Sequence, residues 1–595
     1  MLMFQFSGSI GSKNNVPHTR KLTLSDSTVF RLHIVEGAAI EVSNGTTHAF
    51  IFSVFFQYKE KTGQPALSHF LTDYSNSGQQ ALQHLRGQFV VLLVDTAINS
   101  LTVATDKLGT TPLYYSKTQA GLNFSSHLQP LVSQLDQKPS INTQSIYNYV
   151  FHHCIPAPYT IYENVFKMEC SELVSWNNNT LNKETYFIPT FSNEKINEQT
   201  AQDELIYLLE ASVKDRIANR DNNKVGAFLS GGLDSSTVSG MLSKSLGYKG
   251  AKTFTIGFDA KGYDESAYAK ITADHFKTDH HVYYVTPNDV ESSLQDIASY
   301  YDEPFGNSSA LPAYYCAKFA KEHGVNTMLA GDGGDELFAG NERYAKQKIF
   351  ELYYKVPAPL RKLLLDLPLS NVSDSNPIPL LSKAASYVRQ AKIKLPDRLY
   401  TYNFLHQIDP SSVFTDGMLS SINQGVPISE VGKRYDQLND ADSLSRMLYL
   451  DWKFTLADND LVKVNNMCHK AGVDVLYPML DDRLIELATR VPSNIKLPGN
   501  KLRDYYKAST KPFLPEATIN KSKQGFGLPF GVWMQTNKSL RDMAYDNVLA
   551  LKSTNYFEED FLNNALKLHQ SGEASSYYGE LVWILSMLNM WLEKH

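Results

Sequence analysis

An apolar run that leads into a glycine- and serine-rich loop limits the fold of this 595-residue chain more than any other feature. Residues 225–229 read VGAFL, the loop 230–236 reads SGGLDSS, and the segment after it is predicted to be helical to about Leu246. Strands alternating with helices of 10–15 residues predict a parallel, doubly wound α/β sheet. The alternation continues through predicted strands at 253–258, 281–285 and 327–330 and predicted helices at 264–276 and 311–321.

Residues 1–190 show a different pattern, with short apolar runs separated by turn residues. The runs at 88–94, 101–105 and 113–116 predict a largely β domain. A chain of this length is expected to form at least two domains. With the polar segment 191–200 as the linker, we expect one domain at 1–190 and a second at 201–595, mainly helical beyond Tyr344.

Bulk composition excludes several classes of protein. The net charge of −6 is not that of a nucleic-acid-binding protein. The four cysteines are widely separated, which argues against a disulfide framework or a zinc site and favours a reducing compartment. The first residues are interpreted as a strand rather than a signal peptide, and no apolar run reaches the roughly 18 residues of a membrane span. We expect a cytoplasmic protein without membrane or nucleic-acid partners.

The loop 230–236 has the composition of an anion-binding site at a helix N-terminus. Its two glycines let the backbone approach a phosphate, and Ser230, Ser235 and Ser236 add hydroxyl donors. Asp234 would repel a bare phosphate, whereas Mg²⁺ can bridge its carboxylate to phosphate oxygens. The segment is not a Walker A loop, and a plain Gly-Gly turn with a helix cap is the structural alternative. We predict a pyrophosphate-binding loop.

A second glycine-rich and acidic segment, AGDGGDELFAG at 330–340, also follows a predicted strand. Four glycines and three acidic residues in eleven are costly to order unless a ligand binds there. Asp335 is the predicted second Mg²⁺ ligand, and Asp332 is expected to face the reacting carboxylate or its amine partner. A calcium-type turn is the alternative, but the other ligands of an EF-hand loop are missing.

A basic loop near the C-terminus, NKSKQGFGLPFGVW at 520–533, places Lys521 and Lys523 among three glycines. A fixed ammonium group would stabilise the charge that develops on an α-phosphate and on a pyrophosphate leaving group. Because lysines in loops are usually solvated, the loop alone gives this role little support.

Together these segments resemble the asparagine synthetase B family of glutamine-dependent amidotransferases. LSGGLDSS, TFTIGF, DEPFGNSSALPAYY, AGDGGDELFAG and SKQGFGLPFGVW follow that family's order and spacing, and LRGQFVVLLVD and ATDKLGTTPLYY are similar in the N-terminal half. The resemblance implies an α/β protein with an N-terminal αββα glutaminase-like domain. It also implies a C-terminal ATP-pyrophosphatase domain with a doubly wound parallel sheet and a helical C-terminal part.

The same resemblance implies chemistry and site residues. ATP and Mg²⁺ would activate a carboxylate as an acyl-adenylate with release of pyrophosphate, and ammonia would then displace AMP. Asp234 and Asp335 are the expected metal ligands. Asp332 stands where characterised asparagine synthetases use a glutamate, and Lys523 matches their phosphate-stabilising lysine, so these two are the expected catalytic residues. The expected ATP-binding residues are Leu229, Ser230, Gly231, Gly232, Asp234, Ser235, Ser236, Ile256, Gly257, Ala330 and Gly331.

The N-terminal half departs from the family's pattern. Where family glutaminases begin Met-Cys-Gly, this sequence begins Met-Leu-Met-Phe, and its first cysteine is Cys154. The sequence FSVFFQY at 52–58 replaces the family segment that supplies the Asn-Gly of the oxyanion hole. No acidic residue lies between Glu60 and Asp73 to bind the amino group of glutamine. Loss of the nucleophile alone costs about 10⁴-fold in rate, so we expect this domain to be inactive.

A further departure leaves the substrate open. Asn465 and Asn466 replace a common Asp-Arg pair, and Asp474 and Leu476 stand in a family Glu-x-Arg segment that borders the acceptor pocket. The first hypothesis is amidation of aspartate or another small carboxylate with free ammonia or with ammonia from a separate glutaminase. The alternatives are a β-lactam-synthetase- or lasso-cyclase-like ligase that uses an organic amine, and a non-catalytic scaffold. A homodimer is also left open.

Overall fold

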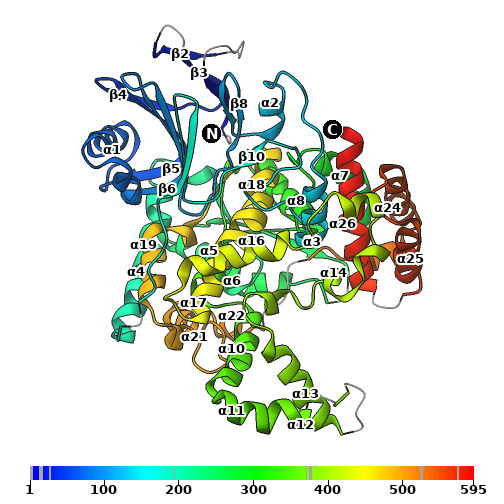
Figure 1. Cartoon of the computed structure of the whole chain (residues 1–595). Helices are drawn as coiled ribbons and strands as arrows, with labels where there is room; N and C mark the ends of the chain where they lie inside the picture. The colour runs from blue at the N-terminus through cyan, green and yellow to red at the C-terminus, as the bar shows by residue number, and fades with distance from the viewer. Residues whose placement is uncertain are drawn as a thin grey trace.

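The computed structural model combines antiparallel sheets in the N-terminal part with a parallel sheet and many helices in the C-terminal part (Figure 1). This confirms the predicted α/β class. The structure describes residues 4–11, 18–25, 28–192, 194–260, 262–369, 372–373, 378–522, 527–572 and 575–595. Among these residues, no helix combines the length and the apolar character needed to cross a membrane.

Two antiparallel sheets of six strands each form the N-terminal part. One has the order β10-β8-β9-β1-β3-β2 and the other β12-β11-β7-β6-β5-β4. The first contains β1 (Gln5–Gly11), β2 (Arg20–Thr23), β3 (Val29–Glu36), β8 (Tyr114–Thr118), β9 (Gly121–Ser125) and β10 (Phe166–Lys167). The second contains β4 (Ile40–Asn44), β5 (Thr47–Tyr58), β6 (Leu85–Asp95), β7 (Ser100–Thr105), β11 (Glu172–Asn177) and β12 (Thr180–Thr185).

The two sheets stack face to face and are covered by helices. Phe6 and Phe52 belong to the core between the sheets, and α1 (Gly63–Ser77) buries Leu67 on the outer face of the second sheet. The short helix α2 (Leu128–Val132) lies against β8 and β9, which completes the αββα arrangement. Strand β6 is apolar along most of its length because it is buried on both faces.

The parallel sheet has the order β15-β14-β13-β16-β17. Its strands are β13 (Val225–Phe228), β14 (Lys252–Phe258), β15 (Asp279–Val285), β16 (Thr327–Leu329) and β17 (Asp474–Leu476). The first four are the strands predicted from sequence, and α5 (Leu233–Ser245), α6 (Ser266–Phe276) and α8 (Ala310–Glu322) match the predicted helices. After β13 the chain adds β14 on one side and β16 on the other, and ligands bind at such a switch point, beyond the carboxyl ends of the strands.

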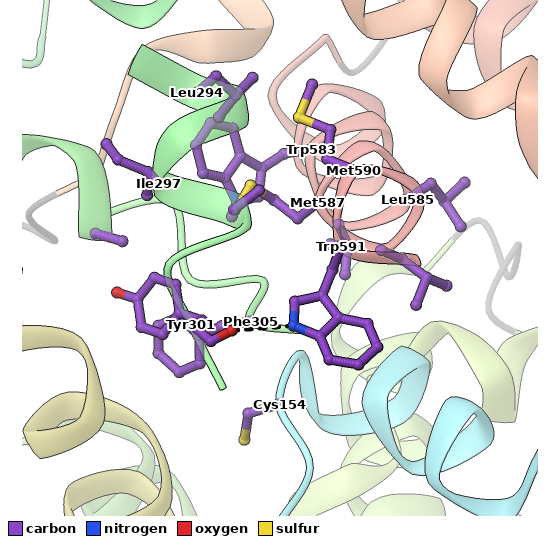
Figure 2. Packing of buried hydrophobic residues seen from close by; sticks show 14 of the residues in the cluster. Cys154, Leu294, Ile297, Tyr301, Phe305, Trp583, Leu585, Met587, Met590 and Trp591 are labelled. Carbon is purple, nitrogen blue, oxygen red and sulfur yellow. Dashed lines mark hydrogen bonds between the residues drawn. The ribbon is translucent and has the colours of Figure 1, made fainter. Parts of the chain in front are cut away.

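The rest of the chain is mainly helical, as predicted. An arm that includes α10 (Glu342–Lys355) and α13 (Pro379–Lys392) projects from the body (Figure 1). The π-helix η7 (Trp452–Asp460) continues into α18 (Leu461–Lys470). The last helix, α26 (Ser575–Lys594), is anchored by its tryptophans, since Trp583 and Trp591 are fully buried and Trp591 Nε1 donates a hydrogen bond of 3.0 Å to the Tyr301 carbonyl (Figure 2).

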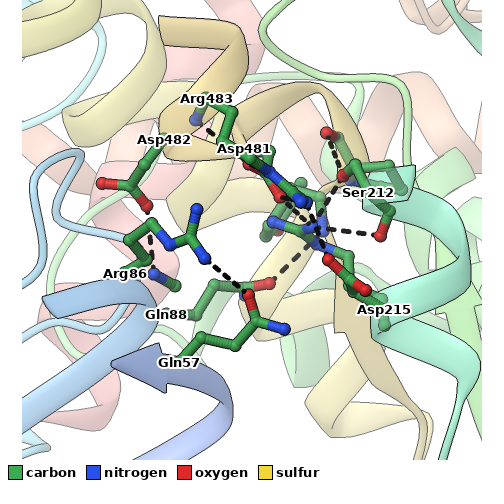
Figure 3. A network of polar contacts seen from close by, with 12 residues as sticks. Gln57, Arg86, Gln88, Ser212, Asp215, Asp481, Asp482 and Arg483 are labelled. Carbon is green, nitrogen blue, oxygen red and sulfur yellow. Dashed lines mark hydrogen bonds and ion pairs between the residues drawn. The ribbon is translucent and has the colours of Figure 1, made fainter. Parts of the chain in front are cut away.

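A polar network joins the N-terminal sheets to the edge of the parallel sheet. The Gln88 side chain donates to the Val475 carbonyl at 3.4 Å and accepts from the Tyr477 backbone N–H at 3.3 Å. The Gly87 N–H donates to the Asp482 carboxylate at 3.1 Å (Figure 3). Edge strand β17 is therefore covered by the N-terminal part of the chain. The boundary between 190 and 201 stays a prediction.

Candidate active site

A cavity of about 650 Å³ lies beyond the carboxyl ends of β13, β14 and β16, large enough for a nucleotide and a small second substrate. Both predicted loops contribute to it. The predicted site residues that line it are Leu229, Ser230, Gly232, Asp234, Ser235, Ile256, Gly331, Asp332 and Asp335.

The first loop is held by its own hydroxyl groups at the N-terminus of α5. The Oγ atoms of Ser230 and Ser235 lie 2.9 Å apart, and the Gly232 N–H donates to Ser230 Oγ at 3.3 Å. Gly231 has a φ of +72°, and a Cβ atom there would lie 2.5 Å from the Ala269 backbone nitrogen. Glycine is therefore required at this turn.

Four predicted ATP-binding residues do not line the cavity: Gly231, Ser236, Gly257 and Ala330. Ser236 is fully buried, and its hydroxyl bonds with that of Thr272 at 3.1 Å, because it lies on the face of α5 that packs against α6. A Cβ atom at Gly257 would lie 2.6 Å from the ring of Tyr284, so this glycine accommodates a neighbouring side chain.

The second loop packs directly against the first. A Cβ atom at Gly331 would lie 2.7 Å from the Ser235 backbone nitrogen. At Gly334 a Cβ atom would lie 2.2 Å from Asp234 Oδ1. These two glycines let the acidic loop approach the start of α5, where Asp234 and Asp335 both contact the side chain of Arg503.

Arg503 joins the two predicted metal ligands. Its guanidinium lies 3.2 Å from the Asp234 carboxylate and also pairs with Asp335. Arg503 is the N-cap residue of α21 (Asp504–Thr510), with a φ of +56°, and is 9% exposed. Sequence reasoning missed this residue, because it lies far from the two loops along the chain, in a segment of ordinary composition.

The carboxylates of Asp234 and Asp335 are ligands of the type that Mg²⁺ takes in sites where it also contacts phosphates. Asp234 Oδ1 is buried and accepts no hydrogen bond from the described part of the chain, so it has capacity for a cation. In the residues that the structure describes, no three His, Cys, Asp or Glu side chains are grouped to hold a metal ion. Mg²⁺ commonly takes one or two carboxylates and completes its shell with phosphate oxygens and water.

Asp332 lies near the end of β16, at the start of the acidic loop, and the opposite charge that acts on it is Lys463, a residue that sequence reasoning missed. Burial raises the pKa of Asp332 to about 6, and the nearby charge of Lys463 opposes this rise. Lys463 on α18 lines the cavity and lies 2.7 Å from Asp460 Oδ1. This part of the cavity thus contains the three charged residues Asp332, Lys463 and Asp460.

The predicted basic loop is only partly described. Lys523 lies outside the described residues, so its role stays a prediction. Lys521 lines the cavity, and its Nζ lies 2.7 Å from Glu265 Oε1.

The substituted residues of the acceptor region do not line this cavity. Asn465 instead donates to the Thr110 carbonyl at 2.7 Å and accepts from the Tyr477 hydroxyl at 2.8 Å. Asp474 pairs with Arg220 at 3.3 Å. Asn465 thus connects the two halves of the chain, whereas the Asp474–Arg220 pair lies within the C-terminal half. Lys463 and Val464, which precede Asn465, reach the cavity.

The thiols of the N-terminal half belong to Cys154 and Cys170, and both are buried. Residues 52–58 lie in strand β5, paired with β6, where the family segment would supply oxyanion donors. All four cysteines are free and buried, and burial raises the pKa of Cys154 and Cys170.

Comparison with known proteins agrees with this arrangement. The sequence pattern of the family described as asparagine synthase matches residues 204–593, and that of the glutamine amidotransferase domain matches residues 68–187. The chain is 25% identical over 532 residues to asparagine synthetase (glutamine-hydrolyzing) 1 of Bacillus subtilis, covering 88% of this chain and 79% of that protein. It is 30% identical over 401 residues to a putative asparagine synthetase (glutamine-hydrolyzing) 2 of Methanocaldococcus jannaschii, covering 66% and 74% respectively.

These matches identify a carbon–nitrogen ligase with an amidotransferase-like domain. The chain belongs to the asparagine synthase family.

Proposed function

We propose that this protein is an amide ligase that uses ATP to adenylate a carboxylic acid, releases pyrophosphate, and transfers the acyl group to ammonia with release of AMP. The observation that carries the proposal is the contact between the loop at 230–236 and the acidic loop at 330–340, which places Asp234 beside Asp335. A pyrophosphate loop of this kind favours cleavage between the α- and β-phosphates, whereas a Walker A loop is absent from this segment.

The residues divide into three roles. Backbone N–H groups at the start of α5, with the hydroxyls of Ser230 and Ser235, would bind the β- and γ-phosphates. Asp234 and Asp335 would hold Mg²⁺, which neutralises phosphate charge when bound. When Mg²⁺ is absent, Arg503 keeps the carboxylates of Asp234 and Asp335 together.

The part of the cavity around Asp332, Lys463 and Asp460 would select and position the carboxylic acid. Lys463 supplies a cation for a substrate carboxylate, and Asp332 would face the reacting acyl group or the amine that attacks it. Fixed charges in a partly buried cavity stabilise the charge that moves onto the α-phosphate with little reorganisation. Lys523 is proposed to add a further cation on the phosphate side.

An ATP–pyrophosphate exchange assay with a panel of carboxylic acids, aspartate first, tests the proposal. We expect one acid to promote exchange of labelled pyrophosphate into ATP, and the complete reaction with ammonium to form AMP. Stoichiometric formation of ADP and phosphate would contradict it. So would the absence of exchange with every acid in a protein that binds ATP.

A further inference from the structure

A second hollow, of about 350 Å³, adjoins the adenylation cavity. The two spaces share Asn307 and Ser309, which precede α8. The other walls come from distant parts of the chain: His153 follows α3 (Thr143–His152), Asn459 lies in η7, and Glu580 lies on α26. A group in this hollow would lie beside the adenylation cavity but away from the phosphate loops.

Glu580 is the acidic side chain of the hollow. Its side chain bonds with that of Ser308, and no lysine, arginine or histidine among the described residues forms an ion pair with it. Burial raises the pKa of Glu580 to about 7, while burial lowers that of His153 to about 4. At pH 8 Glu580 is therefore a charged carboxylate and His153 is a neutral imidazole. A partly buried carboxylate is best stabilised by a paired cation.

The walls of the hollow are firmly held. Helix α26 packs so closely on α23 (Phe530–Thr536) that a Cβ atom at Gly579 would lie 2.4 Å from Gly531 Cα. The Tyr149 hydroxyl donates to the Ile584 carbonyl at 2.7 Å, and Asn307 Nδ2 donates to Asn459 Oδ1 at 2.6 Å. Glu580 is thus presented by a fixed helix, as a preorganised binding group should be.

We propose that this hollow is a subsite for the primary ammonium group of a substrate, bound by the Glu580 carboxylate with Ser308 and the asparagine side chains as further acceptors. The inference rests on the proposed function, because an amide ligase must bring an amine to the acyl group activated in the adjoining cavity. The ammonium group can belong to the amine nucleophile or to the carboxylic acid itself. The chemistry of recognition is the same in both cases.

Ethylammonium chloride is the probe for this subsite. Titrated into the full-length protein with ATP and Mg²⁺ at pH 8 and followed by saturation-transfer NMR, it should bind saturably. Glu580→Gln should weaken the binding of ethylammonium at least about tenfold, because it removes one charge contact. A tenfold change in the dissociation constant corresponds to about 1.4 kcal/mol of binding free energy. Glu593→Gln is the matched control on the same helix, because Glu593 is exposed and accepts a hydrogen bond of 2.9 Å from Asn589 that glutamine can keep.

The pH dependence gives a second readout. Glu580 loses its charge as the pH falls through about 7, so binding by the wild type should weaken about tenfold between pH 8 and pH 6. His153 stays neutral over this range, and the Glu580→Gln variant should show no such change. Equal affinity in the wild type and in Glu580→Gln, or no saturable binding to the wild type, would overturn the inference.

Kinetics then distinguishes the two sources of the ammonium group. If it belongs to the nucleophile, Glu580→Gln raises the KM of the amine and leaves ATP–pyrophosphate exchange unchanged. If it belongs to the acid, the same variant raises the KM of that acid in the exchange reaction. A wild type without exchange for any acid contradicts the proposed function, whereas the ethylammonium titration still decides whether the hollow binds an ammonium group.

Discussion

The guanidinium of Arg503 lies 3.2 Å from the carboxylate of Asp234, a predicted Mg²⁺ ligand in the first turn of α5. The same guanidinium pairs with Asp335. The side chains of these three residues are at most 17% exposed, so solvent screens their charges only partly. Arg503 therefore holds the two carboxylates together, although like charges would otherwise separate them.

Replacing Arg503 with Met should destabilise the protein and make its stability depend strongly on Mg²⁺. Removing one member of a buried ion pair leaves uncompensated carboxylates, at a cost of about 3–5 kcal/mol in the free energy of unfolding. Thermal unfolding with and without MgCl₂ measures this, and the rise in Tm with Mg²⁺ should be larger for Arg503→Met than for the wild type. Lys507→Met is the control, since Lys507 lines the same cavity without pairing with either aspartate. Equal Mg²⁺ shifts in all three proteins would contradict this view of Arg503.

Asp234→Asn and Asp335→Asn should each reduce ATP–pyrophosphate exchange by more than about tenfold, or 1.4 kcal/mol in activation free energy. Each change removes a charged oxygen ligand, while the turns around it are set by glycines such as Gly231. Exchange is measured across a range of Mg²⁺ concentrations, with circular dichroism to check the fold. A variant that keeps more than a tenth of wild-type exchange at every Mg²⁺ concentration would show that its carboxylate is not a metal ligand.

Acyl-adenylate formation should depend on pH through Asp332. Its pKa is raised to about 6, so the carboxylate is charged above that pH and becomes protonated as the pH falls through it. We expect exchange to decline below pH 6 in the wild type and to be low and nearly independent of pH between 5 and 7 in Asp332→Asn. An unchanged decline below pH 6 in the variant would assign the titration to another group.

The parts of the site that follow from local sequence were predictable. A strand, a loop with two glycines and a helix start are encoded in one continuous segment, so Ser230, Asp234 and Ser235 could be assigned to the cavity without a structure. The same holds for Asp332 and Asp335, which follow the next strand at the same sheet edge.

The parts that depend on packing were not predictable. Ser236 resembles its neighbours in sequence, but helix geometry turns its hydroxyl toward Thr272. Strand β17 has only three residues and is recognisable by its pairing with β16 rather than by its composition. Arg503 and Glu580 reach the two cavities from segments far from the phosphate loops, and neither belongs to a recognisable motif.

Glutamine should not serve as the nitrogen donor for the isolated protein. Glutamine hydrolysis of this type needs a thiolate, a base and N–H donors for the tetrahedral oxyanion. Residues 1–153 contain no cysteine, and burial raises the pKa of Cys154 and Cys170, which disfavours their thiolates. The segment 52–58 is paired with strand β6. Gly87 and Gln88 of β6 bond with Asp482, Val475 and Tyr477.

These contacts give the N-terminal domain a structural role that does not depend on glutamine hydrolysis. Gln88→Ala should lower the Tm, because it leaves the Val475 carbonyl and the Tyr477 N–H without a partner at a buried edge, a cost of about 1–3 kcal/mol for each group.

Purified protein incubated with glutamine should release no glutamate above the uncatalysed background, whereas ammonium or an organic amine should support product formation with the correct acid. Glutamate release that survives thiol alkylation would reveal a different nucleophile, and release abolished by alkylation would assign the reaction to one of the four buried cysteines.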